Sequence, residues 1–337
     1  VKNLHVKDAM VNVSSRYQNY TGVLIGFAQS GFVVDNTSAT GTVKSYSQDS
    51  FARGGGLIAS TMRGLVTDSW ADTTVEAGTD MGNVYAGGLY SMDNRVATIN
   101  SYALGDVTAD AGYTNRIHIG GLIGQAGGIH YNCYAAGDVI AKKDCTDVGG
   151  LNGRSAGINV EQECFWNSDA AQKINDTAVE EKAGNGAEVS SHPNTVYARS
   201  LAELSSQDFA DLLNANKGKM AEINEALKAE LVSNSAEGTL TQPYYYEGDG
   251  SDLNEWVTKS GSTVVFKQES EEKPSGGGGN PSGGGTATPF YEVTVPAQTG
   301  NGSVSASLGK AKKGDTVTIT VTPEEGYQPD AVTIKDK

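Results

Sequence analysis

The stretch "NCYAAGDV" at residues 132–139 nearly repeats "NSYALGDV" at residues 100–107, which lies 32 residues earlier. The same phrase stands as "NTSATGTV" at 36–43 and, less well preserved, as "DSWADTTV" at 68–75. A phrase that returns at a fixed spacing of this size is typical of solenoids, propellers and other repeat proteins. The first half of the chain is therefore predicted to be a stack of similar units.

A second phrase, usually a glycine pair followed by leucine, has the same period. It reads "GVLIG" (22–26), "GGLIA" (55–59), "GGLYS" (87–91), "GGLIG" (120–124) and "GGLNG" (149–153). Its leucines are 33, 32, 33 and 29 residues apart, and the first phrase follows each of the first four leucines after 10 to 12 residues. Both phrases therefore belong to one repeating unit.

The local pattern predicts strands. "ATINSYA" (97–103) alternates with period two, and no unit contains a helix-length segment. Stacked units of this kind bury a continuous core that one unit alone cannot bury. We predict a mainly all-β chain whose first part is a right-handed parallel β-helix with one coil per repeat. A propeller is the alternative, but the two-residue hairpin turns of its blades are missing from the sequence.

Stacked coils turn aligned positions into ladders. The small side chains are predicted to point inward, the aromatic ones outward or at the rim, and the amides to form a ladder at a turn. The small ladder is Thr37, Ser69, Ser101, Cys133 and Cys164; the aromatic ladder is Ser38, Trp70, Tyr102, Tyr134 and Phe165; the amide ladder is Asn36, Asp68, Asn100 and Asn132. The leucines form the main apolar column.

We predict that the β-helix spans residues 1–172 and that three further parts follow it. Residues 199–232 have helical spacing with a capping box at Ser200 and Glu203, and "LNEWVTKSGSTVVF" (253–266) predicts two strands around a glycine turn. We assign 173–268 as a helical and β-strand cap that covers the open end of the coils. Residues 269–288 are a Gly/Ser-rich linker, and 289–337 form a small, truncated β domain.

The paired phrases resemble the GLUG motif, a Gly-Leu-x-Gly repeat of streptococcal IgA-cleaving metalloproteases and other bacterial surface proteins. The match is best in "GGLIGQAGGIHYNCYAAGDV" (120–139) and extends over about residues 20–170. "GDTVTITVTPEEGY" (314–327) resembles the divergent internalin-type B-repeat of Gram-positive surface proteins. Together these resemblances imply an extracellular, cell-surface location and the β-helix already predicted from the repeat.

Composition and motifs argue against several classes of function. A net charge of −15 disfavours nucleic acid, and no apolar run is long enough to insert into a membrane. The sequence has four histidines and no H-E-x-x-H, so we expect no metal and no cofactor, and we read His130 as an exposed rung. "GRSAG" (153–157) fits the nucleophile elbow, but its place in the repeat favours a turn. Cys133 and Cys164 align on adjacent coils and are either bridged or, as we favour, free buried thiols.

Two ladders remain as candidate sites. Asp106 and Asp138 stack on adjacent coils and could serve a carbohydrate-active enzyme, although we favour solvated turn residues. Trp70, Tyr102 and Tyr134 are the candidate binding residues: a flat platform for sugars, or else a ladder of stacked rings that only stabilises the coils, which we favour. The variable loops 44–53, 76–86, 108–119 and 140–148 emerge on one side and predict a binding surface.

The sequence thus predicts a non-catalytic stalk, adhesion or accessory-binding region of a secreted or cell-surface bacterial protein, monomeric, with host glycans or glycoproteins as partners. The alternatives are a carbohydrate-active β-helix enzyme, and an accessory segment of a protease whose catalytic domain lies outside this chain. Both ends of the sequence lie within predicted repeats or strands, which suggests a fragment of a longer protein.

Overall fold

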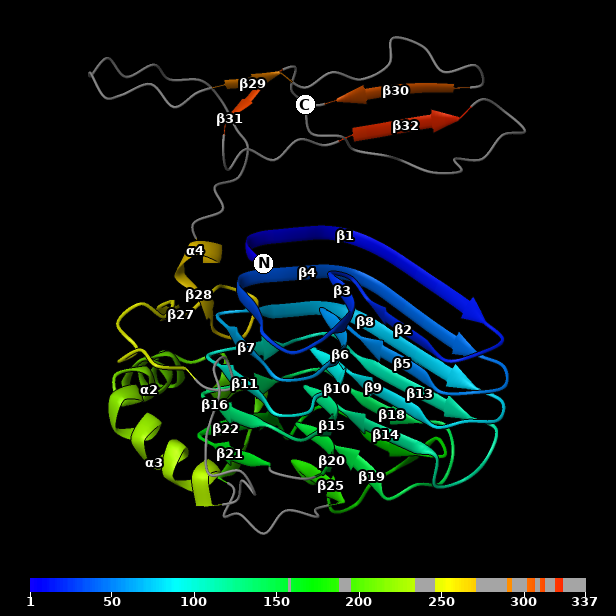
Figure 1. Ribbon diagram of the computed structural model, residues 1–337, viewed down its shortest axis with the longest axis horizontal. Coiled ribbons are helices and arrows are strands. Elements are labelled where there is room, and N and C mark those ends of the chain that lie inside the picture. The colour runs from blue at the N-terminus through cyan, green and yellow to red at the C-terminus, as the bar shows by residue number, and fades with distance from the viewer. Residues whose placement is uncertain are drawn as a thin grey trace. The chain divides into compact units, whose positions relative to one another are not determined.

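A computed structural model of the chain describes residues 1–156, 159–187, 195–233 and 246–270, and four short strands after residue 289. The chain forms two compact units, Val1–Lys273 and Pro274–Lys337. The first is a parallel β-solenoid of about six turns with helices on its flank (Figure 1). The predicted fold class is confirmed, and the propeller alternative is wrong.

Three sheets of stacked strands build the solenoid. The six-stranded sheet contains β3 (Ile25–Ala28), β6 (Ile58–Thr61), β10 (Tyr90–Met92), β15 (Ile123–Ala126), β20 (Asn152–Ser155) and β25 (Asn185–Ala187). The five-stranded sheet contains β2 (Asn19–Gly22), β5 (Ala52–Gly55), β9 (Val84–Gly87), β14 (Ile117–Gly120) and β19 (Asp147–Gly149). The fifteen-stranded sheet contains β1 (Lys2–Ser15), β4 (Phe32–Ser47), β7 (Gly64–Thr67), β8 (Trp70–Thr79), β11 (Val96–Ile99), β12 (Tyr102–Ala103), β13 (Val107–Ala111), β16 (Ile129–Tyr131), β17 (Tyr134–Ala135), β18 (Val139–Ala141), β21 (Val160–Gln162), β22 (Cys164–Asn167), β23 (Gln172–Ile174), β24 (Thr177–Ala178) and β26 (Val196–Arg199).

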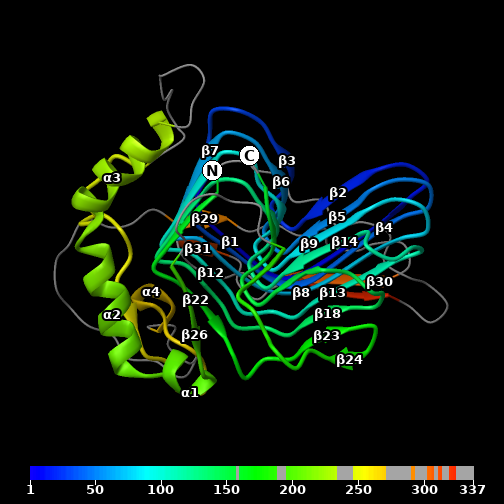
Figure 2. The same cartoon turned by 90° about the horizontal axis from the view of Figure 1, so that it is seen from below.

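Each coil is bent into two arms, as the view along the stack shows (Figure 2). One arm lies between the six-stranded sheet and strands such as β7, and it encloses a core of buried residues that includes Leu57, Leu89, Leu122 and Leu151. The other arm lies between the five-stranded sheet and strands such as β13, and it encloses a second core rich in valine and alanine. The leucine column is thus buried as predicted, with Leu24 partly buried at the first coil.

Glycine makes the inner corner between the arms. At Gly55, Gly87 and Gly149 an added Cβ would lie 2.0 Å from the carbonyl oxygen three residues ahead, where the chain turns back into the six-stranded sheet. The second glycine of the pair faces the opposite wall, and at Gly88 a Cβ would lie 2.7 Å from the Cβ of Ala103. The Gly-Gly-Leu phrase therefore recurs because only a hydrogen atom fits at these positions.

The outer corner uses a left-handed backbone conformation. Asn36, Asp68, Asn100 and Asn132 have φ values of 50°, 50°, 52° and 55°, and Glu163 continues the series at 50°. Asn and Asp tolerate this conformation better than other non-glycine residues. The sharp turn between β7 and β8, and its equivalents in later coils, explains why this column is Asn or Asp in the four repeats of the first phrase.

Three expectations need correction. The solenoid does not end at residue 172, because β25 and β26 add parallel rungs to β20 and β22. The helical part does not close the end of the coils but covers one flank of the stack (Figure 2). The predicted loops on one side are also shorter than expected, since strands β4, β8 and β13 extend well into them.

We call this flanking layer the side cover; it comprises the helices after residue 200 and the segment 246–266. Its elements are α1 (Leu201–Leu204), α2 (Gln207–Lys217), α3 (Met220–Ser233), β27 (Trp256–Val257) and β28 (Val265–Phe266), followed by α4 (Lys267–Ser270). The predicted capping box at Ser200 and Glu203 is present, and β27 and β28 pair antiparallel around a turn with Gly261 at φ 76°.

The second unit contains two antiparallel pairs. β29 (Phe290–Glu292) pairs with β31 (Lys310–Lys312), and β30 (Gly302–Ala306) pairs with β32 (Ile319–Pro323). The division between the units falls inside the predicted linker 269–288, most of which lies outside the described residues, as does much of the predicted domain at 289–337.

Gly87→Ala tests the inner corner. The new methyl group would collide with the Tyr90 carbonyl oxygen, so the coil must open, and overpacking of this kind destabilises by about 1–3 kcal/mol or more. Urea unfolding of the variant should show a lower midpoint. Gly78→Ala is the control, since its nearest contact is 3.5 Å away and its stability should stay close to that of the wild type. Equal midpoints for both variants would contradict the role given to the corner glycines.

Candidate functional site

The three candidate binding residues lie together on one flank of the solenoid. Trp70, Tyr102 and Tyr134 are partners on β8, β12 and β17. The Trp70 and Tyr102 ring centroids are 5.6 Å apart with planes 5° from parallel, and those of Tyr102 and Tyr134 are 5.0 Å apart at 2°. The rings form the stacked ladder that we favoured from the sequence.

The side cover lies on this ladder. Trp256 packs at 5.4 Å from Tyr102 and 5.7 Å from Tyr134, and Phe209 meets Tyr134 edge-on. The hydroxyl of Tyr134 also donates to the carbonyl oxygen of Val264 at 2.5 Å. Tyr102 and Tyr134 are fully buried as a result, whereas Trp70 at the margin is partly exposed.

The burial of Tyr102 and Tyr134 limits how the aromatic ladder could bind a sugar. Only Trp70 offers part of its ring to solvent, and a sugar could stack on Tyr102 or Tyr134 only after the side cover moved away. The binding role of Trp70, Tyr102 and Tyr134 stays a prediction, and the contacts of these rings show a large contribution to packing.

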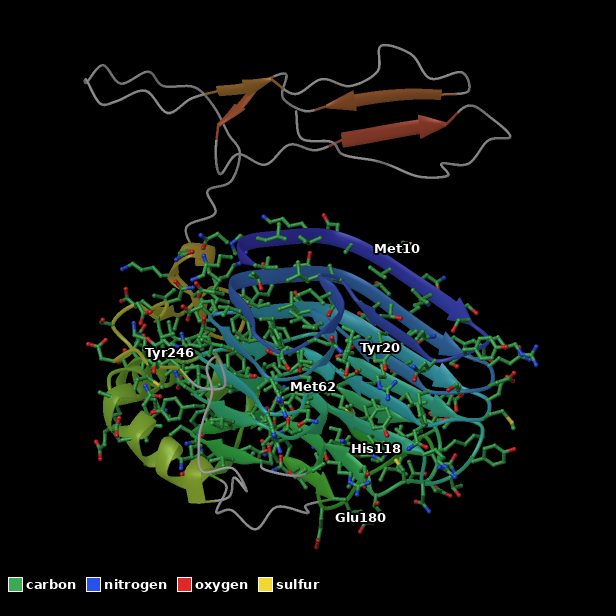
Figure 3. All side chains as sticks on the ribbon, viewed as in Figure 1. Met10, Tyr20, Met62, His118, Glu180 and Tyr246 are labelled. Carbon is green, nitrogen blue, oxygen red and sulfur yellow. The ribbon has the colours of Figure 1, made fainter. Side chains whose placement is uncertain are left out.

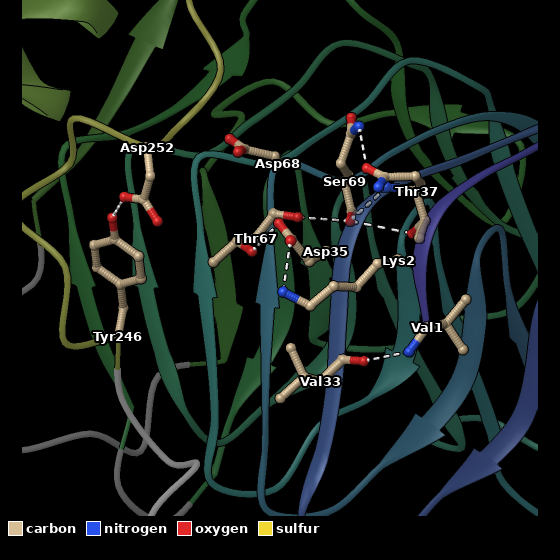
Figure 4. Close-up of polar contacts among 12 residues, drawn as sticks. Val1, Lys2, Val33, Asp35, Thr37, Thr67, Asp68, Ser69, Tyr246 and Asp252 are labelled. Atoms are coloured by element: carbon tan, nitrogen blue, oxygen red, sulfur yellow. Dashed lines mark hydrogen bonds and ion pairs between the residues drawn. The ribbon is translucent and has the colours of Figure 1, made fainter. Parts of the chain in front are cut away.

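A polar ladder runs beside the rings at the outer corner. Asn132 Nδ2 donates to Asn100 Oδ1 at 2.8 Å, and Asn100 Nδ2 donates to Asp68 Oδ1 at 2.6 Å. Asn36 Nδ2 donates to Asn3 Oδ1 at 2.8 Å. The predicted amide ladder is confirmed. The buried small ladder beside it includes a hydrogen bond from Thr37 Oγ1 to Ser69 Oγ at 3.1 Å (Figure 4).

Asn254 of the side cover joins three rungs of the polar ladder. Its backbone N–H donates to Asp68 Oδ2 at 3.0 Å and its amide donates to Asn36 Oδ1 at 3.1 Å. Its carbonyl oxygen accepts from Asn100 Nδ2 at 3.2 Å, and the indole N–H of Trp256 donates to Asn100 Oδ1 at 2.5 Å. The polar ladder is therefore also the line along which the side cover attaches.

Asp68 is the one carboxylate among the described ladder rungs from Asn3 to Asn132. Burial raises its pKa to about 7, against the hydrogen bonds from Asn100 and Asn254 that favour the ionised form. Asp35 adds to the rise by its negative charge, although Lys2 Nζ lies 3.1 Å from that carboxylate (Figure 4). The attachment line thus contains a group that changes its charge near neutral pH.

Asp106 and Asp138 accept hydrogen bonds from backbone N–H groups of the following coil. Asp106 Oδ1 accepts from the N–H of Asp138 at 2.9 Å, and Asp138 Oδ1 accepts from the N–H of Ala171 at 2.7 Å. These contacts give both carboxylates a structural use at a turn. Ser155, the candidate nucleophile, ends β20 and is fully buried, and its hydroxyl accepts from Asn159 Nδ2.

The histidine and cysteine assignments have different outcomes. His130 is not an exposed rung: it is fully buried, and its Nε2 lies 2.9 Å from Asp93 Oδ2. Although burial opposes the charge, the Asp93 carboxylate raises the pKa of His130. Cys133 and Cys164 are buried and unbridged, as we favoured. Among the described residues, no three His, Cys, Asp or Glu side chains group as metal ligands.

Asn254 and Phe209 could not be recognised from the sequence as partners of the ladders. Neither belongs to the repeat, and the only signal was the apolar spacing of the helix and the tryptophan in the following strand. Within the described part of the chain, none of the helices has the length and apolar character of a membrane span.

Comparison with known proteins confirms both resemblances. Residues 115–140 match the family model of the GLUG motif, and residues 291–332 match that of the divergent InlB B-repeat domain. Among curated proteins nothing matches the chain. One similar solved structure is described as a "putative immunoglobulin A1 protease from Bacteroides ovatus", with 13% identity and a TM-score of 0.35. The alignment covers 72% of this chain and 56% of that one.

Asp68→Asn tests the charged rung. The pKa of about 7 in the folded state lies above the value of about 3.9 for an unfolded chain, so the folded state binds this proton more tightly. The stabilisation it gives is complete below about pH 4 and is lost as the pH rises to about 7. Urea unfolding between pH 4 and 8 should show a loss, on the order of 2–4 kcal/mol, that the variant lacks.

The control for this experiment is Asp110→Asn, which changes an exposed aspartate on β13. It should keep the pH dependence of the wild type, including any part due to His130. Parallel curves for the wild type and Asp68→Asn would contradict the assignment.

Tyr102→Ala separates packing from binding. Loss of a fully buried ring in contact with Trp256 and Tyr134 should lower stability by about 3–5 kcal/mol, seen as a large fall in melting temperature. Tyr113→Ala, at a site 54% exposed, should change stability by about 0.5 kcal/mol or less. Unchanged melting of Tyr102→Ala, combined with lost glycan binding on an array, would favour the platform.

Proposed function

We propose that this chain is a non-catalytic stalk and binding region of a secreted or cell-surface bacterial protein. One observation supports it above the others: the chain combines a GLUG match at 115–140 with a divergent InlB B-repeat match at 291–332. Repeat modules of these two kinds resemble parts of bacterial surface proteins, which supports an extracellular location.

The solenoid has the properties of a stiff spacer. Apart from β24, which pairs antiparallel with β23, the strands of the solenoid pair parallel with the equivalent strands of neighbouring coils, and buried side chains fill both arms. In such a stack each repeat is stabilised by its neighbours, so length can be added without a new core. The use of Asp106 and Asp138 to hold backbone N–H groups favours this role over a carbohydrate-active enzyme.

The arm tip opposite the inner corner is the surface that we assign to partners. Its turns expose large side chains on three of the coils: Tyr17 is 70% exposed, Met81 57% and Tyr113 54%. The hydroxyl of Tyr113 lies 3.7 Å from the sulfur of Met81, so neighbouring coils form one surface. Exposed apolar groups at turns of this kind are typical of interaction sites. Host glycans or glycoproteins are the proposed partners of a monomeric chain.

Bead adhesion tests the proposal. Beads coated with the chain should adhere to surfaces coated with mucin-type glycoproteins, and the triple change Tyr17→Ala, Met81→Ala and Tyr113→Ala should reduce adhesion several-fold. Met10→Ala is the control, because Met10 is 87% exposed on β1, away from the arm tip. Adhesion no greater than that of uncoated beads would overturn the binding role.

The enzyme alternative has its own test. The chain is incubated with a panel of polysaccharides and reducing ends are measured. We expect no release; release that disappears in Asp106→Asn/Asp138→Asn would replace the stalk with a carbohydrate-active enzyme.

A further inference from the structure

The outward side of the five-stranded sheet has a column of side chains that neither the fold nor the proposed function explains. Tyr20, Arg53, Tyr85, His118 and Asp147 are register partners on β2, β5, β9, β14 and β19. Their strand neighbours Val84, Ala86 and Ile119 pack into the core of the arm, so the column points away from it. Tyr20 and His118 are labelled on these strands in Figure 3.

Arg53 lies among aromatic rings. Its Cζ is 4.7 Å from the ring centroid of Tyr20, 5.2 Å from that of Phe51 and 5.2 Å from that of Tyr85. The residue is 9% exposed. Ring faces stabilise a guanidinium charge by cation–π attraction, which explains how the charge can be kept at this burial. We call Arg53 with these three rings the Arg53 cluster.

The hydrogen-bonding capacity of two of the three guanidinium nitrogens is not used. Its Nε and Nη1 are buried and have no hydrogen-bond partner among the described residues. Nor does any described carboxylate form an ion pair with it: Asp49 pairs with Arg16 at 2.7 Å, and Asp147 pairs with His118. Leaving such buried donors unmatched is unfavourable. A carboxylate accepts two parallel N–H bonds from Nε and Nη2 or from Nη1 and Nη2, so it would give an acceptor to one of these two buried donors.

The neighbouring residues fit a sugar better than a peptide. Tyr85 stacks on His118 with centroids 4.6 Å apart and planes 18° from parallel. Asn83 Nδ2 lies 3.3 Å from the Tyr85 hydroxyl and 3.4 Å from His118 Nε2, which places polar atoms around the flat rings. A sugar has the same combination of an apolar C–H face and a polar rim. A peptide strand would need a free sheet edge, and β5 and β9 are paired on both sides.

We propose that the Arg53 cluster binds the carboxylate of an acidic sugar, with the partly exposed ring of Tyr85 in contact with the sugar. Phe51, which is 37% exposed in the turn before β5, is the ring that turns aside to admit the carboxylate. The site does not depend on adhesion at the arm tip, with which it shares no residue.

The experiment measures binding by calorimetry with two acidic probes and their neutral counterparts. Sialyllactose is compared with lactose, and a hyaluronan tetrasaccharide with a neutral chitin tetrasaccharide. At least one acidic probe should bind at least tenfold more tightly than its counterpart. Arg53→Lys keeps the positive charge but removes the fork, and it should lower that affinity at least tenfold. Phe51→Ala removes the ring that must turn aside, so it should bind more tightly than the wild type.

Arg95→Lys is the matched control, because Arg95 is an exposed arginine outside the cluster, and it should leave affinity unchanged. Melting temperature is measured for every variant. Arg53→Lys with unchanged affinity, or with a lower melting temperature as its only effect, would mean that Arg53 only holds the rings together. No preference for the acidic probes, or equal binding of a glutamate-rich peptide, would also overturn the proposal. Neither result would affect bead adhesion through Tyr17, Met81 and Tyr113, so the two proposals fail separately.

Discussion

The inner corner of each coil leaves room for a hydrogen atom and for nothing larger, and the bent shape of the solenoid depends on this. At Gly55, Gly87 and Gly149 the chain reverses so sharply that the carbonyl oxygen three residues ahead occupies the place of a side chain. The leucine two positions after each of these glycines then turns into the core of one arm, while the preceding strand faces the core of the other. Since the corner strands pair with their equivalents in the neighbouring coils, a corner opened in one coil would disturb its neighbours.

The inner corner excludes a side chain, whereas the outer corner uses side chains that hydrogen-bond along the stack. Its left-handed residues need a side chain that both donates and accepts along the stack, and the amide of Asn100 or Asn132 does both. Asp68 has no amide group to donate, and among the bonds that define the ladder none joins Asp68 to Asn36. Asn254 of the side cover supplies the missing donors to both residues. The break in the ladder and the attachment of the side cover therefore both follow from the presence of an aspartate, Asp68, at this rung.

Features that repeat could be predicted from the sequence, because stacking requires each coil to match the one beneath it. The leucine column, the small ladder of Thr37 to Cys164 and the amide ladder were all visible in this way. The side cover could not be placed, since no spacing rule links Phe209 or Trp256 to a ring more than 70 residues earlier. The helices could cover either the open end of the coils or the exposed aromatic ladder, and composition alone does not show which of the two they cover. His130 was misjudged for a related reason: its partner Asp93 lies 37 residues away in sequence and fits no aligned column.

Columns that stabilise the coils and columns that could bind a ligand differ in how constant their residue type is from coil to coil. Those that hold the coils together keep one chemistry over several rungs: leucine in the core, small side chains beside it, amides at the outer corner. The column through Arg53 changes at every rung, from tyrosine to arginine, tyrosine, histidine and aspartate. Neighbouring rungs of this column contact one another, yet the buried Nε and Nη1 of Arg53 have no acceptor among the described residues. A ligand has different groups at different points of its structure, so a column that recognises one must differ from rung to rung. The column whose residue type changes from coil to coil is therefore the candidate for ligand binding, and the columns that keep one residue type form the scaffold.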